Sequence, residues 1–259
     1  MILMFAGSGA ITPHVIKHGG SRLHSFLNER NHIARWTYPN SLMVDSGAHS
    51  WNKLGMHSVG GAAKSSLPNI YEHMKAYMDF MEAHKEKPFV FVELDCYGHL
   101  SKDYLDGIYR DVMSMKGRKF QFIRVYHPAI DAGSLETLKE WVDEGQQYIG
   151  VGNDSQPFYG NIFRITKASV KLHCFACTKM DVLGKYPFYS VDSTTALAPG
   201  RHGGALVDGR YVGRDTLRKM RSVELVQSVE DKTDQAVQQI LRAQSYFTDL
   251  WAKRGITWQ

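Results

Sequence analysis

The sequence has few cysteines, no long apolar run and no basic segment ahead of its apolar start. Its 259 residues include only Cys96, Cys174 and Cys177, too few and too oddly numbered for the disulfide framework of a small secreted domain. The opening MILMFAGS is apolar but short, so it predicts a strand and not a signal peptide. No stretch approaches the length of a membrane span. These absences favour a soluble, cytoplasmic protein without a membrane partner.

The composition is that of a globular protein that can bury a core. Hydrophobic residues make up 43% and charged residues 22% of the chain, which is ordinary for a folded domain. The formal net charge of +5 and the pI of about 9.0 favour an anionic partner. Since no low-complexity tract, Pro-rich linker or repeat interrupts the sequence, we expect a single domain over residues 1–259.

Short apolar strands alternate with amphipathic helices along the chain. Regular alternation of this kind predicts right-handed crossovers and a parallel sheet, and the length fits a compact (β/α)8 TIM-like barrel, which needs roughly 250 residues. An eighth strand is expected either at His32–Thr37 or within Gly204–Val212. The seven other strands are expected at Ile2–Ala6, Leu42–Val44, Phe89–Leu94, Phe120–Tyr126, Tyr148–Val151, Val170–Phe175 and Phe188–Val191.

Helix signals stand between these strands. Ser101 and Ser134 are expected to cap two helices, and Gly145 to stop the second. A third apolar stripe runs from Ile70 to Met81. The last long helix, at 229–253, carries an apolar stripe and is expected to close the barrel.

The ends of the predicted strands carry polar residues and glycines. In a (β/α)8 barrel the carboxyl ends of the strands carry the chemistry, and burying several acids at one rim without a ligand is costly. Alone, Asp45 can simply turn the chain, Glu93 can pair with Arg124, and the two histidines can be satisfied core residues. The strand-end residues are Asp45, Glu93, Asp95, His127, Gly150, Gly152, His173 and Asp192.

A metal site is the competing interpretation of the cysteines. His173, Cys174 and Cys177 lie close in sequence, and Cys96 can approach from another strand. A lone CxxC without a second pair is a weak zinc signal, and the first strand has no His-x-His pair of the kind that metal-dependent barrel hydrolases carry. Apolar packing of the cysteines is favoured, and no metal or other cofactor is expected.

Four segments together resemble the tRNA-guanine transglycosylase superfamily. VDSGAHSW is similar to the segment with that family's acid/base aspartate, VELDCYG to its base-recognising strand, YIGVGN to its glycine-rich base platform and YSVDSTT to the segment with its nucleophilic aspartate. The family's tRNA enzymes carry a Cys-rich zinc motif, whereas no cysteine follows Cys177 here. The chain is therefore more similar to the branch that inserts 7-deazaguanines into DNA, found in phages and bacterial modification clusters.

The resemblance implies a base exchange at C1′ of deoxyguanosine through a covalent aspartyl-sugar intermediate. Asp192 is then the nucleophile and Asp45 the acid/base. The partners are a flipped guanine nucleotide of DNA and a free 7-deazaguanine base, in the host cytoplasm if the chain is phage-encoded. The residues that the resemblance places at the base are Asp95, Glu93, Gly150, Gly152, His127, His173, Ser46 and Gly47.

A basic segment at 201–221 follows the proposed nucleophile. Its cations are expected to contact phosphates, although a solvated basic helix is the simpler alternative. Three other functions stay open: the same exchange on tRNA, a metal-dependent barrel hydrolase and a non-catalytic nucleic-acid-binding barrel. The cations of the segment are Arg201, Arg210, Arg214, Arg218, Lys219 and Arg221.

Overall fold

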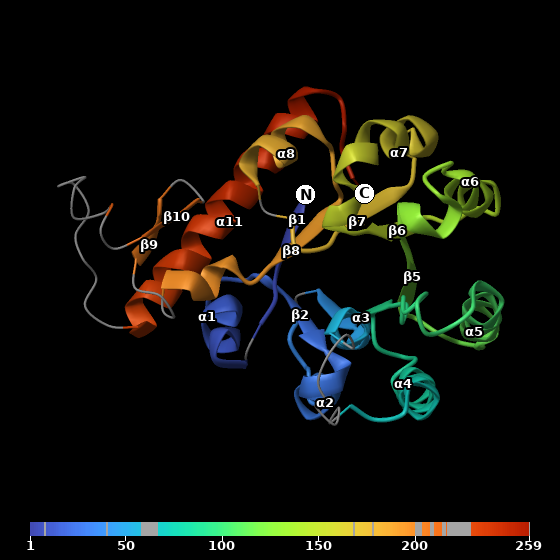
Figure 1. The fold of residues 1–259 in the computed structure, drawn as a ribbon. Helices are drawn as coiled ribbons and strands as arrows, with labels where there is room; N and C mark the ends of the chain where they lie inside the picture. Colours follow the sequence, from blue (N-terminus) through green and yellow to red (C-terminus); the bar gives the residue numbers. More distant parts are fainter. Residues whose placement is uncertain are drawn as a thin grey trace. The chain divides into compact units, whose positions relative to one another are not determined.

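The computed structural model describes residues 1–7, 9–39, 41–57, 67–167, 169–177, 179–199, 204–207, 210–213, 216 and 229–258. Eight parallel strands form a closed barrel in chain order, β1 to β8, and helices alternate with them (Figure 1). The predicted (β/α)8 barrel is confirmed. The strands are β1 (Ile2–Phe5), β2 (Ser21–Ser25), β3 (Leu42–Asp45), β4 (Val90–Val92), β5 (Gln121–Tyr126), β6 (Tyr148–Val151), β7 (Lys171–Cys174) and β8 (Ser190–Ser193).

The eighth strand is β2, which neither expected position contains. Residues 32–34 end a helix, and Gly204–Val212 contains β9 (Gly204–Val207) and part of β10 (Arg210–Gly213), which form a separate antiparallel sheet. The segment SRLHS was not expected to be a strand because it is polar, so both expected positions for the eighth strand were wrong. Arg22 and His24 are fully buried in β2, and Arg22 donates to the backbone carbonyls of Phe5, the last residue of β1, and of Gly7.

The chain divides into two compact units. The first, unit 1, comprises Met1–Leu23, Tyr38–Asn40 and Tyr126–Gln259, and the second, unit 2, comprises His24–Thr37 and Ser41–Val125. Unit 1 holds β1, β6, β7 and β8, whereas unit 2 holds β3, β4 and most of β5. Each unit supplies its own set of candidate site residues.

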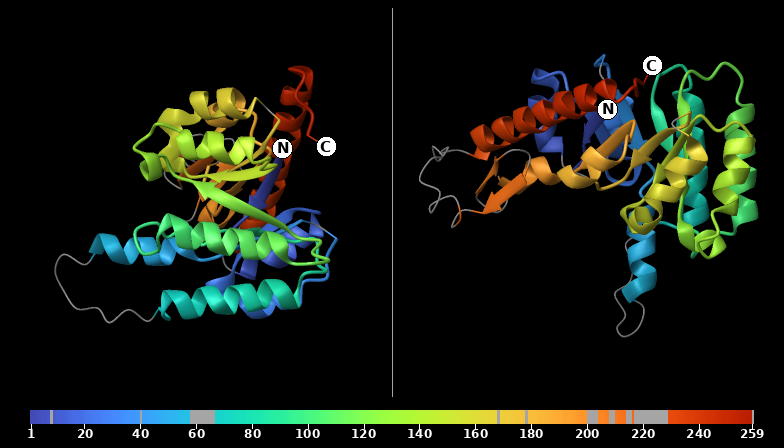
Figure 2. Two further views of the ribbon diagram at one scale, coloured as in Figure 1. Left: turned by 90° about the vertical axis from the view of Figure 1, so that its right-hand side faces the viewer. Right: turned by 90° about the horizontal axis from the view of Figure 1, so that it is seen from above.

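The helices between the strands are as follows. They are α1 (Thr12–Lys17), α2 (Phe26–Ala34), α3 (Ala48–His57), α4 (Ile70–Ala83), α5 (Lys102–Ser114), α6 (Glu136–Asp143), α7 (Tyr159–Thr166), α8 (Met180–Lys185) and α11 (Val229–Lys253), with short 3-10 turns η1 (Gly9–Ile11), η2 (Pro128–Asp131), η3 (Asn153–Phe158) and η4 (Thr195–Leu197). In unit 2, α4 and α5 lie side by side (Figure 2). None of the helices in the described ranges is both long and apolar enough to cross a membrane.

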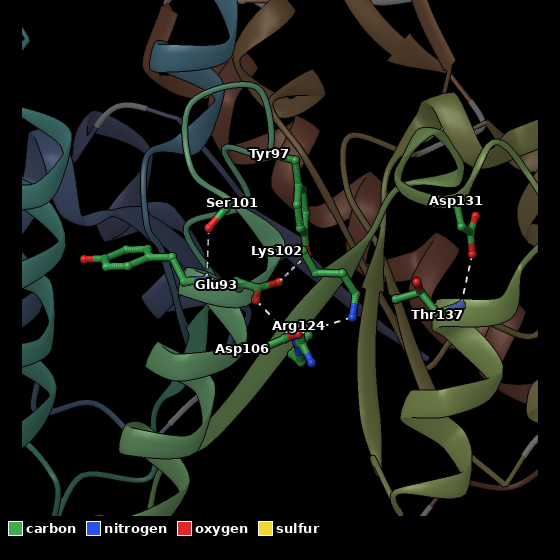
Figure 3. A network of polar contacts seen from close by, with 9 residues as sticks. Glu93, Tyr97, Ser101, Lys102, Asp106, Arg124, Asp131 and Thr137 are labelled. Atoms are coloured by element: carbon green, nitrogen blue, oxygen red, sulfur yellow. Dashed lines mark hydrogen bonds and ion pairs between the residues drawn. The ribbon is translucent and has the colours of Figure 1, made fainter.

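Local sequence signals fix several helix ends. The hydroxyl of Ser101 accepts from the amide of Tyr104 at 3.2 Å, as a cap does. At the start of α6 the stronger cap is the carboxylate of Asp131, which accepts from the amide of Thr137 at 3.0 Å (Figure 3). Gly145 has φ +86° after α6, which glycine adopts without strain. The predicted cap at Ser101 and stop at Gly145 are confirmed. The predicted cap at Ser134 was wrong, because the N-cap residue of α6 is Leu135 and Ser134 accepts only from the Glu136 amide, at 3.4 Å.

The predicted C-terminal helix is confirmed with the bounds given above. In unit 1, α11 packs against α1, α8, η4, β1 and β9 (Figure 1). Its residues Val237, Ile240 and Phe247 are buried, and the indole of Trp251 donates to the Leu183 carbonyl at 3.0 Å. The helix is therefore part of the core of unit 1.

Candidate functional site

Asp192 lies in β8, one residue before the end of the strand. Its Oδ1 accepts from the Ala176 amide at 2.9 Å and contacts His173 Nε2 at 3.3 Å. Among the residues that the structure describes, Oδ2 makes no hydrogen bond. The side chain of Asp192 keeps 11% exposure while that of His173 has none. One oxygen is thus held by the protein, and the other is left for a ligand.

The loop after β7 adopts a strained backbone conformation where it contacts Asp192. Ala176 has φ +52°, in the left-handed region, where a residue other than glycine loses on the order of 1 kcal/mol or more. Its amide donates directly to Asp192. Because strain of this kind persists where the surroundings impose it, the loop conformation marks Asp192 as a group that the fold holds in place.

A chain of buried side chains leads away from Asp192. His173 Nδ1 lies 2.7 Å from the hydroxyl of Ser190, and this hydroxyl contacts that of Tyr148. Burial raises the pKa of Tyr148 well above its ordinary value, so the phenol stays protonated. The register brings these residues together, since His173 of β7 pairs with Ser190 of β8.

The two cysteines of the CxxC segment are buried as free thiols beside this chain. Cys174 Sγ lies 2.9 Å from the hydroxyl of Tyr159, which also donates to the Gly152 carbonyl at 3.1 Å. Burial raises the pKa of Cys174, so it stays protonated. Within the described residues, no three His, Cys, Asp or Glu side chains gather as a metal ion would require.

His127 and the two glycines lie elsewhere in unit 1. His127 Nδ1 contacts Asp154 Oδ2 at 3.2 Å, and this contact lowers the pKa of Asp154. Gly150 is buried in β6 opposite His173. A Cβ added at Gly152 would collide with the carboxylate of Asp154. The space over Gly152 is therefore filled by the protein's own side chain in this state.

In unit 2, Asp45 is the last residue of β3 and is half-buried. The next residue, Ser46, donates its hydroxyl to the Glu93 carbonyl at 2.9 Å and accepts at its own carbonyl from His73 Nε2 at 2.8 Å. Gly47 has φ +94°, and a Cβ there would lie 2.8 Å from that of Leu27. The turn after Asp45 thus requires glycine and is fixed from two sides.

Asp95 follows β4 and shares its surroundings with Asp45. Burial, then the charges of Asp95 and Asp45, raise the pKa of Cys96 to about 12. Asp45 also contributes, after burial, to the raised pKa of Tyr77. Asp45 and Asp95 therefore both lie close enough to the Cys96 thiol for their charges to act on it.

Glu93 is buried with a full set of protein partners (Figure 3). One oxygen contacts Arg124 Nε at 3.4 Å, and the other accepts from the Val125 amide at 3.0 Å and from Tyr97 at 3.2 Å. Arg124 also contacts Asp106, which Lys102 reaches at 3.2 Å. The pairing of Glu93 with Arg124, one of the two sequence alternatives, is confirmed. Burial raises the pKa of Glu93 to about 7 despite the arginine.

The proposed phosphate-contacting segment falls largely outside the described residues. This holds for Arg201, Arg214, Arg218, Lys219 and Arg221, while the backbone of Arg210 begins β10. The interpretation of this segment as a nucleic-acid contact stays a prediction.

Sequence reasoning missed three residues that contact the candidate acids or their neighbours. Ser190 and Tyr148 extend the contacts of His173, and His73 holds the turn after Asp45. Burial lowers the pKa of His73, which favours its neutral form. Only the polar residue inside an apolar strand, Ser190 in FYSVDS, was a visible signal.

The fold and these side chains define a closed parallel (β/α)8 barrel with carboxylates at or just beyond three strand ends. Comparison of the chain with protein-family models, with curated proteins and with solved structures gave no match.

Proposed function

We propose that this protein exchanges guanine in DNA for a free 7-deazaguanine base, with Asp192 as the nucleophile. The observation that carries the proposal is the asymmetry of the Asp192 carboxylate. Two donors hold Oδ1, and no described residue engages Oδ2. A carboxylate nucleophile needs this arrangement, because one oxygen attacks while the other becomes the carbonyl of the ester. The resemblance of YSVDSTT to the nucleophile segment of the transglycosylases is a second, independent support.

The exchange occurs in two displacements at C1′. Asp192 Oδ2 forms a bond to C1′ as the bond to guanine N9 breaks, and the departing base takes a proton from the carboxyl group of Asp45. The free 7-deazaguanine then attacks C1′ through its own ring nitrogen and gives its proton to Asp45, and the ester bond to Asp192 breaks. Two displacements retain the configuration, as in retaining glycosidases. The net reaction consumes no cofactor.

Recognition of the base is assigned to Asp95, which can accept from the guanine N1–H and amino group. The backbone around Gly150 and Gly152 contacts the base edge, which requires Asp154 and His127 to move from their place over Gly152. Glu93 supports the site indirectly, through Arg124 and the carbonyl that holds Ser46. The target nucleotide leaves the stack, because C1′ and the base edge are inaccessible within a duplex.

Incubation of the protein with DNA and a free 7-deazaguanine tests the proposal. Mass spectrometry of the digested nucleosides should show the 7-deazaguanine nucleoside, and a denaturing gel should trap a covalent protein–DNA adduct. Parallel reactions with tRNA identify the polymer, and incorporation into tRNA alone would contradict the DNA assignment. Absence of exchange and adduct on both polymers would contradict the proposal itself.

A further inference from the structure

The side chains behind Asp192 form a continuous hydrogen-bonded chain through three adjacent strands. Tyr148 of β6 contacts Ser190 of β8, Ser190 contacts His173 of β7, and His173 contacts Asp192 of β8. Tyr148 is 5% exposed, and His173 and Ser190 are fully buried. A ligand at Oδ2 therefore meets Asp192 but not the residues behind it.

The proposed nucleophile is an ionised Asp192, and with this carboxylate and a neutral imidazole the direction of each hydrogen bond follows. An ionised carboxylate only accepts, so His173 must carry its proton on Nε2. In the neutral ring Nδ1 is then an acceptor, so Ser190 donates to it. The Ser190 oxygen is left to accept from the protonated phenol of Tyr148. All donors point along the chain toward Asp192, an arrangement in which each bond polarises the next.

We infer that His173, Ser190 and Tyr148 are positioning residues that hold Asp192 Oδ1 and so direct Oδ2 at C1′. This inference rests on the proposed function. It changes the role that the resemblance implies for His173, which acts through Asp192 and does not contact the base. In the ester intermediate Oδ1 is the carbonyl oxygen, and it keeps both its donors. When the ester breaks, the same donors stabilise the carboxylate that leaves.

Among the described residues, the other neighbours of the His173 ring do not compete with this hydrogen-bonded chain for its nitrogens. The ring of Phe175 packs edge-on against it at 4.3 Å between centroids. The charge of Asp192 contributes an upward shift to the pKa values of two titratable groups, Cys174 and Cys177. Across the strands, Gly150 of β6 pairs with His173. Asp192 is thus the only acid that the described residues place in contact with the imidazole.

The tautomer of His173 tests the chain without any substrate. Protein labelled with 15N-histidine should give, at neutral pH, a His173 signal pair with a protonated Nε2 and an unprotonated Nδ1, assigned by its loss in His173→Gln. Ser190→Ala removes the donor to Nδ1 and should shift that resonance. A cationic ring, or a ring protonated on Nδ1, in the wild-type protein would overturn the inference.

The rate of adduct formation tests the positioning role. His173→Leu removes the donor to Oδ1 and should slow the adduct roughly a hundredfold, whereas His173→Gln keeps an N–H donor and should lose about tenfold or less. Both should bind DNA as the wild type does. A wild-type rate in the Leu variant, or a loss of DNA affinity in place of rate, would contradict the inference.

The Tyr148→Phe variant removes only a single hydroxyl at the far end of the hydrogen-bonded chain. It therefore tests the inference even if the His173 variants fail to fold. Its adduct rate should fall a few-fold and its pH profile should move, while Tyr189→Phe, one residue before Ser190, should change neither. Identical adduct rates and pH profiles in Tyr148→Phe and Tyr189→Phe would show that the functional chain stops at Ser190. This result would overturn the role of Tyr148. Absence of wild-type adduct contradicts the proposed function, whereas the NMR measurement judges the chain itself.

Discussion

Asp192 and Glu93 are both buried carboxylates near the ends of barrel strands, yet their surroundings are opposite. Glu93 in unit 2 has the Arg124 guanidinium, a backbone amide and a phenol on its two oxygens. Asp192 in unit 1 has an amide and an imidazole, both on one oxygen. No Lys or Arg of the described residues reaches it.

The difference separates an acid that supports the fold from one that is available for chemistry. A buried ion pair with all its hydrogen bonds made has nothing left to offer a ligand, although its removal is costly. A buried carboxylate with one open oxygen gains less from its surroundings and stays reactive. The position of an acid at a strand end is therefore not enough to assign a role, and the partners of each oxygen decide it.

Replacing each acid by its amide gives the sharpest test of this comparison. Asp192→Asn should abolish adduct and base exchange, a loss on the order of ten-thousand-fold or more, with stability unchanged or slightly raised. Glu93→Gln should keep exchange within about tenfold, and its unfolding free energy should differ from that of the wild type in a pH-dependent way. Nucleoside analysis and urea denaturation of both variants measure the two effects. Exchange at the wild-type rate by Asp192→Asn would make Asp192 a structural acid like Glu93.

Asp45 extends the comparison to the acid/base. In Asp45→Asn the nucleophile remains and only proton transfer is impaired, so exchange should fall roughly a hundred- to ten-thousand-fold. Single-turnover rates with guanine and with a better leaving base separate the steps, because a good leaving group needs less protonation. The deficit should shrink with the better leaving group. An equal deficit for both bases would argue against proton transfer by Asp45.

Removing the cation from Glu93 should destabilise unit 2. Arg124→Met leaves a buried acid without its partner and should cost about 3 kcal/mol or more of unfolding free energy. Adding Glu93→Gln to Arg124→Met should recover part of this loss, since the uncompensated acid is then gone. Arg118→Met, which removes a partly exposed arginine bonded to a backbone carbonyl, is the matched control. Chemical denaturation of the three variants would refute the pairing if the Arg124 and Arg118 variants behaved alike.

The raised pKa of Glu93 predicts a pH dependence of stability. Its pKa is about 7 in the folded protein against 4.5 for the free side chain, so the folded state binds the extra proton between these values. The contribution of Glu93 to the unfolding free energy is therefore greatest at low pH. It falls by on the order of 3 kcal/mol as pH rises from about 4.5 to about 7. Glu93→Gln should flatten this slope in urea titrations at pH 5 and 7.5. Parallel slopes for the two proteins would contradict it.

The sequence predicted the barrel because strand and helix periodicities are local signals. Seven strands, the capping Ser101 and the last helix needed only neighbouring residues. The strand β2 was missed because it buries the polar residues Arg22 and His24, and Arg22 is satisfied by the carbonyls of Phe5 and Gly7. A polar segment of this kind cannot be distinguished from a loop by its pattern.

The candidate site likewise contains residues that the sequence predicted and contacts that it did not. Asp45, Asp95 and Asp192 were visible as acids after apolar runs, and Arg124 was visible as a possible partner of Glu93. The contacts of His173 with Ser190 and Tyr148 depend on the register of three strands, and the donation by Ala176 depends on its left-handed backbone. Such features arise from the assembled fold, so the sequence alone could not predict them.

The smallest expected effect concerns a third acid, Asp234 on α11, which completes the comparison at the surface. Its Oδ1 is reached by His18 Nε2 at 2.9 Å, His14 Nδ1 at 3.2 Å and Lys17 Nζ at 3.2 Å, all from or just beyond α1. Partial burial raises its pKa, but these hydrogen bonds outweigh burial and lower the pKa well below the ordinary value. Asp234 thus has a cationic partner in Lys17, as Glu93 has in Arg124, yet it lies where water competes for its contacts.

Asp234→Asn should therefore cost only about 1 kcal/mol at neutral pH, a fall in Tm of roughly 2–4 °C for a chain of this size. Because the folded pKa is depressed, the contribution is present above the unfolded value of 3.8 and is lost as pH falls below it. The wild-type and variant melting curves should approach each other as pH falls below 3.8 and converge only below the depressed pKa of folded Asp234. Asp249→Asn, an exposed acid on the same helix, should change little at any pH. A loss in Asp234→Asn that did not shrink at all as pH fell below 3.8 would mean that packing of α11 on α1, and not the charge of Asp234, joins the two helices.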